Sequence, residues 1–541
     1  MLNIIPKPQY AEERLGEFTV TRDTTVFADP RLSYARDRLI EEVEKACGFR
    51  LQVVETKQAA IRFLVDKHIP KEGYTMEADT ERLTITASAV AGAFYAVQTF
   101  RLLTLTELLD SPEMLSMHAL YIRDEPEYEY RGILFDDARY FHGPDTVKAL
   151  LDMMAFNKLN VLHWHLTDNE GWRIEIKKYP KLIDIGSRRR GSQHIAWGNR
   201  SIDWTEHEGF YTQKEIQEIV SYAARMNIMV IPEIDMPAHM GAAIAAYPEL
   251  SCGDIHMEVP IIHGATPETN GIGDVIACAG KESTYKFIYD IIDELSVLFP
   301  APYFHIGGDE APKKEWKKCP HCQALIREKG LKDEEELQGY FNNKIAVYLE
   351  RKGKRMIGWN EILKARTLDN SVIAEYWTPQ RDPNVENYLM SGRNIIVAKH
   401  QAFYFDMPYA QNTLKRTYEF TPEKYGLNAD PERILGVEGA LWSEWISTDE
   451  RIQYQLYPRM QALSEVAWTK AENRNYRDFR LRLKKYLPIL DKRNIGYCPP
   501  SMLDPKNPLK RAKICRAFVK SNAHIEYNRA LVVQKRRRYK L

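Results

Sequence analysis

The sequence predicts a (β/α)8 TIM barrel, an α/β fold, preceded by a small α/β domain. From residue 131 onward, eight short apolar or β-branched runs alternate with stretches of helical periodicity, and this alternation is typical of such a barrel. Acidic, aromatic and imidazole side chains follow the ends of these runs, where barrel enzymes form their active sites. The length of 541 residues also suits one large barrel with an additional unit.

The first predicted unit covers residues 1–126 and contains neither a cluster of acids nor a phosphate-binding glycine loop. We therefore interpret it as a non-catalytic packing domain. Its expected strands are 51–54, 61–64 and 83–86, and its expected helices are 34–46 and 89–103.

The second unit, residues 127–495, is the predicted barrel. A capping box at Thr212-Gln-Lys-Glu215 predicts a helix start before the third strand, and 479–490 has the pattern of the final helix. The remainder, 496–541, is a predicted basic tail, for which a solvated or partner-docked end is more usual than a grip on an anionic surface. The expected strands are 132–136, 161–166, 228–235, 304–307, 355–359, 372–377, 395–398 and 437–442.

The charge balance excludes several classes of partner. Basic and acidic residues number 75 each, so no overall field recruits nucleic acid or an anionic membrane. No apolar run of about 18 residues predicts a membrane span. The N-terminus lacks the regions of a signal peptide, so we expect a cytoplasmic protein, although a secreted mature form with a new Met would look the same. The sequence leaves monomer and homodimer open.

The seven cysteines are sparse and odd in number, which favours a reduced protein over a disulfide scaffold. Cys319-Pro-His-Cys322 has the spacing of a redox motif but lacks the βαβ context of one. We expect it to be structural, with metal or redox chemistry as the weaker alternative, and we expect no metal and no other cofactor. Cys252 and Cys278 flank a long insertion, and the sequence does not decide whether they pair.

The most informative segment is a short apolar run that ends in two glycines and two adjacent carboxylates, Asp309 and Glu310. A strand that ends in Gly-Gly turns sharply and lets another molecule approach its backbone. Two close carboxylates repel each other's charge, so one stays protonated near neutral pH and serves as a general acid. Ordinary glycosidases place two carboxyls about 5 Å or more apart across the scissile bond. If this pair cleaves a sugar, we expect the nucleophile to come from the substrate.

Other chemically active side chains follow the remaining strands. Arg131 is the exception, because it lies at the start of the first strand, and this position alone indicates a structural role. The residues that end or follow strands are Asp168, Asp235, His239, Trp359, Trp377, Tyr404, Asp406, Trp442 and Glu444.

Several ordered motifs together resemble glycoside hydrolase family 20, the β-N-acetylhexosaminidases. The resemblance extends from residue 131 to about 470, and Ile5-Pro-Lys-Pro8 with 92–103 resembles the small N-terminal domain of that family. The motifs are Arg131-Gly-Ile-Leu-Phe-Asp136, His163-Trp-His-Leu-Thr-Asp168, Gly171-Trp-Arg173, Pro232-Glu-Ile-Asp-Met-Pro-Ala-His239, His305-Ile-Gly-Gly-Asp-Glu310, Gly358-Trp-Asn-Glu361 and Leu441-Trp-Ser-Glu444.

The resemblance implies an exo-acting, retaining enzyme that removes terminal non-reducing β-linked GlcNAc or GalNAc without a cofactor. The 2-acetamido carbonyl of the substrate would attack the anomeric carbon and form an oxazolinium intermediate. By the same resemblance, Glu310 is the general acid and base, and Asp309 orients the acetamido group. The natural glycan and the choice between GlcNAc and GalNAc stay open.

The resemblance also implies roles around this pair. Trp359, Trp377 and Trp442 resemble the walls of the acetamido pocket, and Tyr404 resembles the hydroxyl that binds its carbonyl oxygen. Here the resemblance contradicts the positional argument for Arg131. Arg131, Asp406 and Glu444 resemble the residues that hold sugar hydroxyls, and Asp168, Asp235 and His239 resemble those that orient and tune the acid. The chain departs from the family pattern at Asn169-Glu170, Asn360 and Cys278-Ala-Gly280, which concerns leaving-group preference.

Two alternative functions remain at this stage. A metal-dependent barrel hydrolase is one, because His163 and His165 point the same way along a strand and Asp235 or His239 could complete a site. A sugar-binding barrel without activity is the other. The presence of both Asp309 and Glu310 argues against it, because a binding module needs no general acid.

Overall fold

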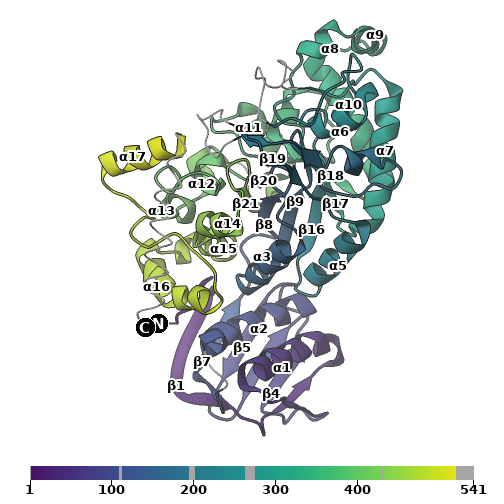
Figure 1. Ribbon diagram of the computed structural model, residues 1–541. Coiled ribbons are helices and arrows are strands. Elements are labelled where there is room, and N and C mark those ends of the chain that lie inside the picture. Colours follow the sequence, from purple (N-terminus) through teal and green to yellow (C-terminus); the bar gives the residue numbers. More distant parts are fainter. Residues whose placement is uncertain (1, 109–111, 194–201, 262–274, 429, 520–541) are drawn as a thin grey trace.

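A computed structural model describes residues 2–108, 112–193, 202–261, 275–428 and 430–519. A small sheet domain lies below a large barrel, so the predicted fold class is confirmed (Figure 1). Within the described ranges, no helix has both the length and the apolar composition that a membrane span requires.

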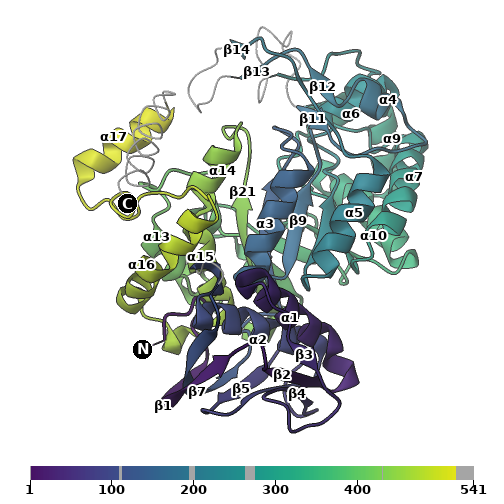
Figure 2. The same cartoon turned by 60° about the horizontal axis from the view of Figure 1, so that its bottom comes forward.

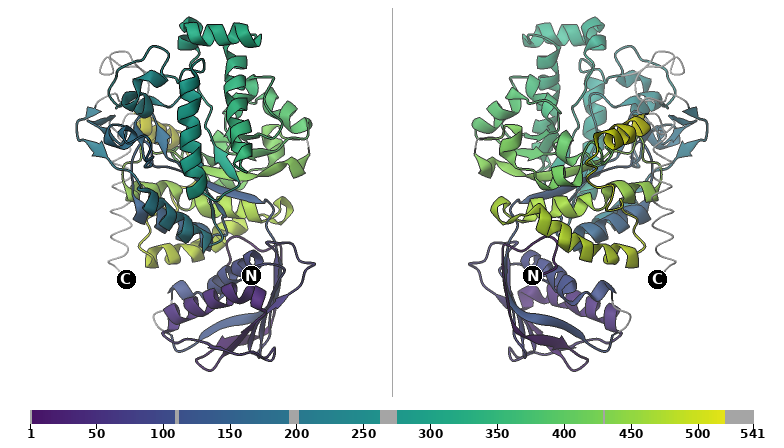
Figure 3. Two further views of the ribbon diagram at one scale, coloured as in Figure 1. Left: turned by 90° about the vertical axis from the view of Figure 1, so that its right-hand side faces the viewer. Right: turned by 90° about the vertical axis from the view of Figure 1, so that its left-hand side faces the viewer.

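The N-terminal domain is a seven-stranded sheet with two helices on one face. Figure 3 shows both helices on the side of the sheet that faces the barrel. The strand order is β1-β7-β5-β6-β4-β2-β3, and all five predicted elements are present. The elements are β1 (Tyr10–Val20), β2 (Thr25–Ala28), α1 (Ser33–Cys47), β3 (Gln52–Val53), β4 (Ile61–Val65), β5 (Tyr74–Ala78), β6 (Leu83–Ala87), α2 (Val90–Thr104) and β7 (Leu115–Asp124).

Helix α2 joins this domain to the barrel. It is apolar over most of its circumference and almost entirely buried, because the sheet covers one side and the barrel covers another. Its Tyr95 ring lies 5.0 Å from the ring of Trp468 in the barrel domain. A buried ion pair between Lys158 and Asp124, 2.9 Å long, adds a polar connection. The two domains therefore share one continuous core.

The barrel is closed and built of eight parallel strands, and all eight predicted strands are confirmed. The strand β17 is short because the chain turns at Gly307. The strands are β8 (Tyr130–Asp136), β9 (Val161–His165), β16 (Met229–Glu233), β17 (Tyr303–His305), β18 (Arg355–Trp359), β19 (Ile373–Tyr376), β20 (Ile395–Val397) and β21 (Ile434–Leu441).

Helices surround the barrel, and the predicted capping box is confirmed at the start of α5, where the side chains of Thr212 and Glu215 each accept a backbone hydrogen bond of the other residue. The helices used below are α3 (Pro144–Phe156), α5 (Gln213–Ala224), α7 (Glu282–Leu298), α8 (Lys314–Lys318), α9 (Pro320–Lys329), α10 (Glu334–Arg351), α12 (His400–Phe403), α13 (Leu414–Tyr418), α15 (Arg459–Trp468) and α16 (Tyr476–Lys492).

The chain continues to pack after α16. Cys498 and Leu503 are fully buried, so the first part of the predicted tail belongs to the core. A last helix, α17 (Pro508–Val519), lies at one edge of the molecule (Figure 2), where Arg511 Nε donates to the Ala410 carbonyl at 3.1 Å. The basic run from residue 520 onward lies outside the described residues.

Candidate active site

The turn after β17 requires glycine at two successive positions. Gly307 and Gly308 have φ angles of 65° and 94°, which L side chains rarely adopt. A Cβ atom on Gly307 would lie 1.8 Å from Asp235 Oδ1, and one on Gly308 would lie 2.6 Å from Ile362 Cγ2. The turn thus packs directly against its neighbours and delivers Asp309 and Glu310 at the carboxyl end of the barrel.

The two adjacent carboxyls have different surroundings. The side chain of Asp309 is 14% exposed and that of Glu310 is 51% exposed. Burial and the negative charges of Glu361 and Glu310 raise the pKa of Asp309 to about 7, although the charge of His239 opposes this rise. His239 Nε2 lies 3.7 Å from a carboxylate oxygen of each member of the pair. The pair is therefore asymmetric: the Asp309 carboxyl is largely buried, whereas the Glu310 carboxyl is open to a ligand.

A network of buried charged side chains contacts the pair through His239. His239 Nδ1 lies 3.2 Å from Asp168 Oδ1, and Asp168 Oδ2 lies 2.9 Å from His165 Nε2. Burial opposes a charged His239, but Asp168, Asp235 and Asp309 more than offset this effect and hold its pKa well above the usual range. The backbone N–H of Gly308 donates to Asp235 at 3.2 Å. These contacts fix the orientation of His239 and of the glycine turn.

Four aromatic side chains that the family resemblance assigned to one pocket lie together at the mouth. The ring of Trp359 lies 5.8 Å from that of Trp442, and Trp377 stacks on Tyr404 at 5.9 Å. Tyr404 lies 6.3 Å from Trp442, which links the two pairs. Trp359 Nε1 donates to Glu233 at 3.0 Å and Trp377 Nε1 donates to Glu361 at 2.8 Å, so both indoles are fixed by hydrogen bonds.

Asp406 and Glu444 lie near each other beside this wall, and an arginine that the sequence analysis missed pairs with Glu444. Burial and the nearby charge of Glu444 raise the pKa of Asp406 well above its usual range. Arg139 Nη2 lies 2.8 Å from Asp168 and 3.9 Å from Glu444, and its guanidinium lies over the Trp442 ring. This group offers both donors and acceptors to a polar ligand.

The assignment of Arg131 to this site is wrong. Arg131 is fully buried at the base of β8, at the opposite end of the barrel, where it forms an ion pair with Glu72 at 2.9 Å. It also donates to the Tyr95 hydroxyl at 2.8 Å and lies over the ring of Trp468. The position of Arg131 at the start of a strand already indicated this structural role.

Three other residues of the site escaped the sequence analysis. Arg139 and Glu361 each follow a barrel strand within a few residues, so the rule that found Asp168 could have found them. Glu361 accepts the Trp377 hydrogen bond and receives a long one from the Glu310 backbone at 3.5 Å. Glu233 is the last residue of β16, but the predicted strand continues to 235 and makes it an inner strand residue; the closed barrel brings it to the imidazoles of His165 and His305.

The two histidines that suggested a metal-dependent hydrolase lie among buried carboxylates. His165 has both ring nitrogens within hydrogen-bond distance of carboxylates, 2.6 Å from Glu233 and 2.9 Å from Asp168. Burial opposes its charged form, but these carboxylates raise the pKa of His165 to about 10. His163 Nδ1 lies 2.9 Å from Glu438 in the same network. Both imidazoles thus belong to a network of buried carboxylates, which favours their charged forms.

Comparison with known proteins identifies the family. The sequence profile described as "Glycosyl hydrolase family 20, catalytic domain" matches residues 128–471, and "Glycosyl hydrolase family 20, domain 2" matches residues 1–125. The chain belongs to glycosyl hydrolase family 20. The recognised resemblance is thereby confirmed, and the chain is a glycoside hydrolase.

Relatives within family 20 include a beta-hexosaminidase of Porphyromonas gingivalis, 37% identical over 520 residues that cover 92% of this chain and 64% of that protein. The beta-hexosaminidase of Vibrio furnissii is 34% identical over 480 residues, and the match covers 86% of this chain and 76% of that protein. Among solved structures, the exo beta-N-acetylglucosaminidase of Vibrio harveyi in complex with N-acetylglucosamine has a TM-score of 0.81 and 32% identity, with 92% of this chain and 78% of that chain covered. The chain thus spans about two thirds of the length of its Porphyromonas relative.

Proposed function

We propose that the protein is an exo-acting, retaining β-N-acetylhexosaminidase that hydrolyses terminal non-reducing β-linked GlcNAc or GalNAc. The observation that carries the proposal is the asymmetric pair on the glycine turn, with Asp309 held in the wall and Glu310 open at the mouth. Two neighbouring residues of one chain do not flank a glycosidic bond from opposite sides. The attacking group is therefore the acetamido oxygen of the substrate.

Each carboxyl has its own step in the proposed reaction. Glu310 protonates the leaving oxygen as the acetamido carbonyl attacks the anomeric carbon, and the C–O bond to the leaving group breaks. The product of this step is an oxazolinium ion with its positive charge shared over the former amide. Asp309 accepts the amide N–H and stabilises that charge in its ionised form. Glu310, now a carboxylate, then removes a proton from the water that opens the ring.

The aromatic wall supplies the pocket for the acetamido group. Trp359, Trp377 and Trp442 offer apolar ring faces that suit the methyl group, and Tyr404 donates its hydroxyl to the carbonyl oxygen. The hydrogen bonds of two indoles to Glu233 and Glu361 keep this pocket rigid. A rigid pocket holds the acetamido oxygen close to the anomeric carbon, which lowers the entropic cost of attack.

Arg139, Asp406 and Glu444 bind the hydroxyls of the terminal sugar. They lie together at the mouth and combine a guanidinium with carboxyl acceptors, which suits hydroxyls that both donate and accept. Arg139 thereby takes the role that the resemblance had given to Arg131. The relatives support this class of substrate, since one structure is titled an exo beta-N-acetylglucosaminidase in complex with N-acetylglucosamine and another relative is named N,N'-diacetylchitobiase.

The test measures nitrophenol release from 4-nitrophenyl β-N-acetylglucosaminide and β-N-acetylgalactosaminide. We expect turnover of the acetylated substrates and none of the matching β-glucoside, because the glucoside carries no internal nucleophile. Glu310→Gln should reduce kcat/KM at least ~1000-fold with a methyl β-N-acetylglucosaminide, measured by release of the free sugar, because its alkoxide is a poor leaving group and depends on the general acid. Glu328→Gln on the surface of α9 should match the wild type.

Two outcomes would contradict the proposal. Hydrolysis of the β-glucoside at a comparable rate would show that the acetamido group is not required. Binding of N-acetylglucosamine without any nitrophenol release would support the sugar-binding alternative.

A further inference from the structure

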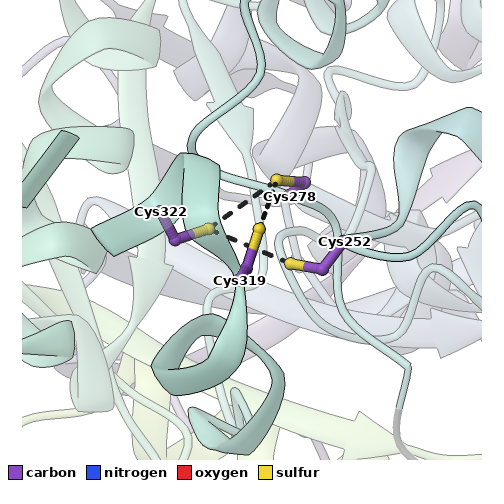
Figure 4. Close-up of side chains that lie close together, drawn as sticks. All are labelled: Cys252, Cys278, Cys319 and Cys322. Atoms are coloured by element: carbon purple, nitrogen blue, oxygen red, sulfur yellow. Dashed lines mark hydrogen bonds between the residues drawn. The ribbon is translucent and has the colours of Figure 1, made fainter. Parts of the chain in front are cut away.

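Four cysteines from three distant segments meet on the outer side of the barrel mouth. Cys252 lies in the segment after α6 (Gly241–Ala246), Cys278 lies just before α7, and Cys319 and Cys322 lie at the start of α9. Figure 4 shows their four sulfurs facing one another. Cys278, Cys319 and Cys322 are buried, and Cys252 is partly buried.

The sulfur–sulfur distances match those of ligands around a single ion. The Sγ atom of Cys278 lies 3.7 Å from the Sγ atom of Cys319 and 3.7 Å from that of Cys322. The Sγ atoms of Cys252 and Cys322 lie 3.9 Å apart. A tetrahedral zinc site with Zn–S bonds of about 2.3 Å places its sulfurs roughly 3.8 Å apart. A disulfide needs about 2.05 Å, so these thiols are not paired covalently. Cys252 and Cys278 therefore do not form a disulfide, and both belong to a cluster of four free thiols.

The backbone around the cluster is built for close approach. A Cβ atom on Gly280 would lie 2.3 Å from the carbonyl carbon of His321 and 2.5 Å from the nitrogen of Cys322, so only glycine lets the two segments meet. Ser251 and Ala277, the residues before Cys252 and Cys278, form an antiparallel bridge. Three segments are therefore fixed with their sulfurs pointing inward.

The donor set and its surroundings select the ion. Four thiolates in a tetrahedron favour Zn²⁺ or iron over harder cations such as Mg²⁺ or Ca²⁺. Four thiolates around a divalent ion leave a net charge of about −2. Lys281 offsets part of it, because its ammonium group lies beside the cluster and donates to the Ser251 carbonyl at 2.7 Å.

We infer that Cys252, Cys278, Cys319 and Cys322 bind one Zn²⁺ in a closed structural site. All four ligands come from the protein, so no position remains for water or substrate, and the ion takes no part in the hydrolysis. This assignment replaces the sequence-based expectation that the Cys319-Pro-His-Cys322 segment binds no metal.

The ion would stabilise the segments that carry the catalytic groups. The backbone N–H of Ala277 donates to the Pro237 carbonyl at 2.8 Å, two residues before His239. Trp316 in α8 donates its indole N–H to the Ala277 carbonyl at 2.9 Å, and α8 directly follows the turn that carries Glu310. The zinc site therefore connects the loop of His239 to the loop of Glu310 from behind.

The first experiment measures the metal content of the full chain purified under reducing conditions without added metal. We expect about one zinc per chain in the wild type and in Cys47→Ser, whose thiol lies in the N-terminal domain. The double variant Cys319→Ser/Cys322→Ser should contain less than about a tenth of that zinc. Its thermal midpoint should fall by ~5 °C or more.

A second measurement holds even where the double variant does not fold. Refolding the wild type with Co²⁺ in place of zinc should give the intense visible bands of tetrahedral cobalt and the near-ultraviolet bands of four sulfur ligands. A mercurial reagent should release zinc in proportion to the cysteines that it modifies. A wild-type chain without metal and with four freely reactive thiols would overturn the inference. Two disulfides, or stoichiometric iron in place of zinc, would overturn it as well.

Discussion

The two ends of the barrel are best compared through two arginines that lie eight residues apart. Arg131 begins β8 at the base and Arg139 follows the same strand at the mouth, and both are buried and paired with carboxylates. All five N–H donors of Arg131 are used within the protein, two by the Glu72 carboxylate and the others by Tyr95, Tyr128 and Lys158. A guanidinium with no donor left cannot bind a substrate.

Arg139 has a different balance of charge. Carboxylates of Asp136, Asp168, Glu170 and Glu444 all lie within 4 Å of its guanidinium, so acceptors outnumber the cation. Two buried carboxyls on this side, Asp235 and Asp406, have raised pKa values, chiefly through burial. At the base, every donor of Arg131 is thus paired. At the mouth, carboxyl groups outnumber the cations, and a hydroxylated ligand can form hydrogen bonds with them. A surplus of carboxyl groups over cations, rather than burial, therefore distinguishes the candidate site at the mouth from the base, where the barrel joins the N-terminal domain.

Between the two ends of the barrel, the largest expected effect comes from Arg139→Lys at the mouth. Lysine keeps the charge but loses the planar fork that reaches several acceptors at once, so sugar hydroxyls and Asp168 are no longer positioned together. We expect kcat/KM for the nitrophenyl substrate to fall ~100-fold, or ~3 kcal/mol of transition-state stabilisation. The free energy of unfolding should also fall, by ~1–2 kcal/mol, because the buried carboxylates of Asp136 and Asp168 keep only part of their pairing. A loss confined to unfolding, with kinetics intact, would reverse the comparison.

Arg131→Lys is the matched variant at the base. A lysine offers three donors in place of five and leaves part of the buried Glu72 carboxylate without a partner. We expect the free energy of unfolding in urea to fall by ~2–3 kcal/mol. Because the substrate does not reach this end, kcat/KM per folded molecule should stay within about twofold of the wild type. A large kinetic loss with unchanged stability would restore the role that the family resemblance suggested.

These two arginines also show what the sequence could predict. Each barrel strand is defined by its own apolar run, so local periodicity found all eight, and the position of Arg131 within its run placed it at the base. The resemblance misled at the same residue, because Arg131 and Arg139 lie in one short segment and only the fold separates them. Strand β1 was missed because most of its side chains are exposed and no alternation appears. Contacts between distant segments, such as the four cysteines, depend on the closed fold and leave no local pattern.

A smaller effect is expected from Asp309→Asn on stability, and its pH dependence gives the test. The pKa of Asp309 is about 7 in the folded protein and lies near 4 in the unfolded chain. The folded state therefore binds the proton more tightly, so ionisation lowers stability as pH rises from about 4 to about 7, and the full penalty remains above that range. The shift corresponds to at most ~4 kcal/mol.

We expect Asp309→Asn to recover ~2 kcal/mol of this ionisation penalty at pH 8. The recovery is only partial because the variant also loses the attraction between the carboxylate and His239. Urea unfolding of the variant and the wild type at pH 4 and pH 8 measures the difference. The gain should be absent at pH 4 and present at pH 8, while activity is strongly reduced. An equal change at both pH values would mean that Asp309 carries no ionisation penalty in the folded protein.

The smallest expected effects separate two buried tyrosines, one at each end. At the base, the Tyr95 hydroxyl accepts from Arg131 at 2.8 Å and from Asn227 at 2.6 Å, so Tyr95→Phe removes the acceptor of one buried and one partly buried donor. This should cost ~1–2 kcal/mol of stability and leave kinetics unchanged. At the mouth, Tyr404 stacks on Trp377, and its proposed partner is the acetamido oxygen of the substrate. Tyr404→Phe should therefore lower kcat/KM ~10-fold, or ~1.4 kcal/mol, with unfolding unchanged. Kinetics and urea unfolding of both variants form a crossed test, because a structural hydroxyl changes only stability and a substrate-binding hydroxyl changes only kcat/KM.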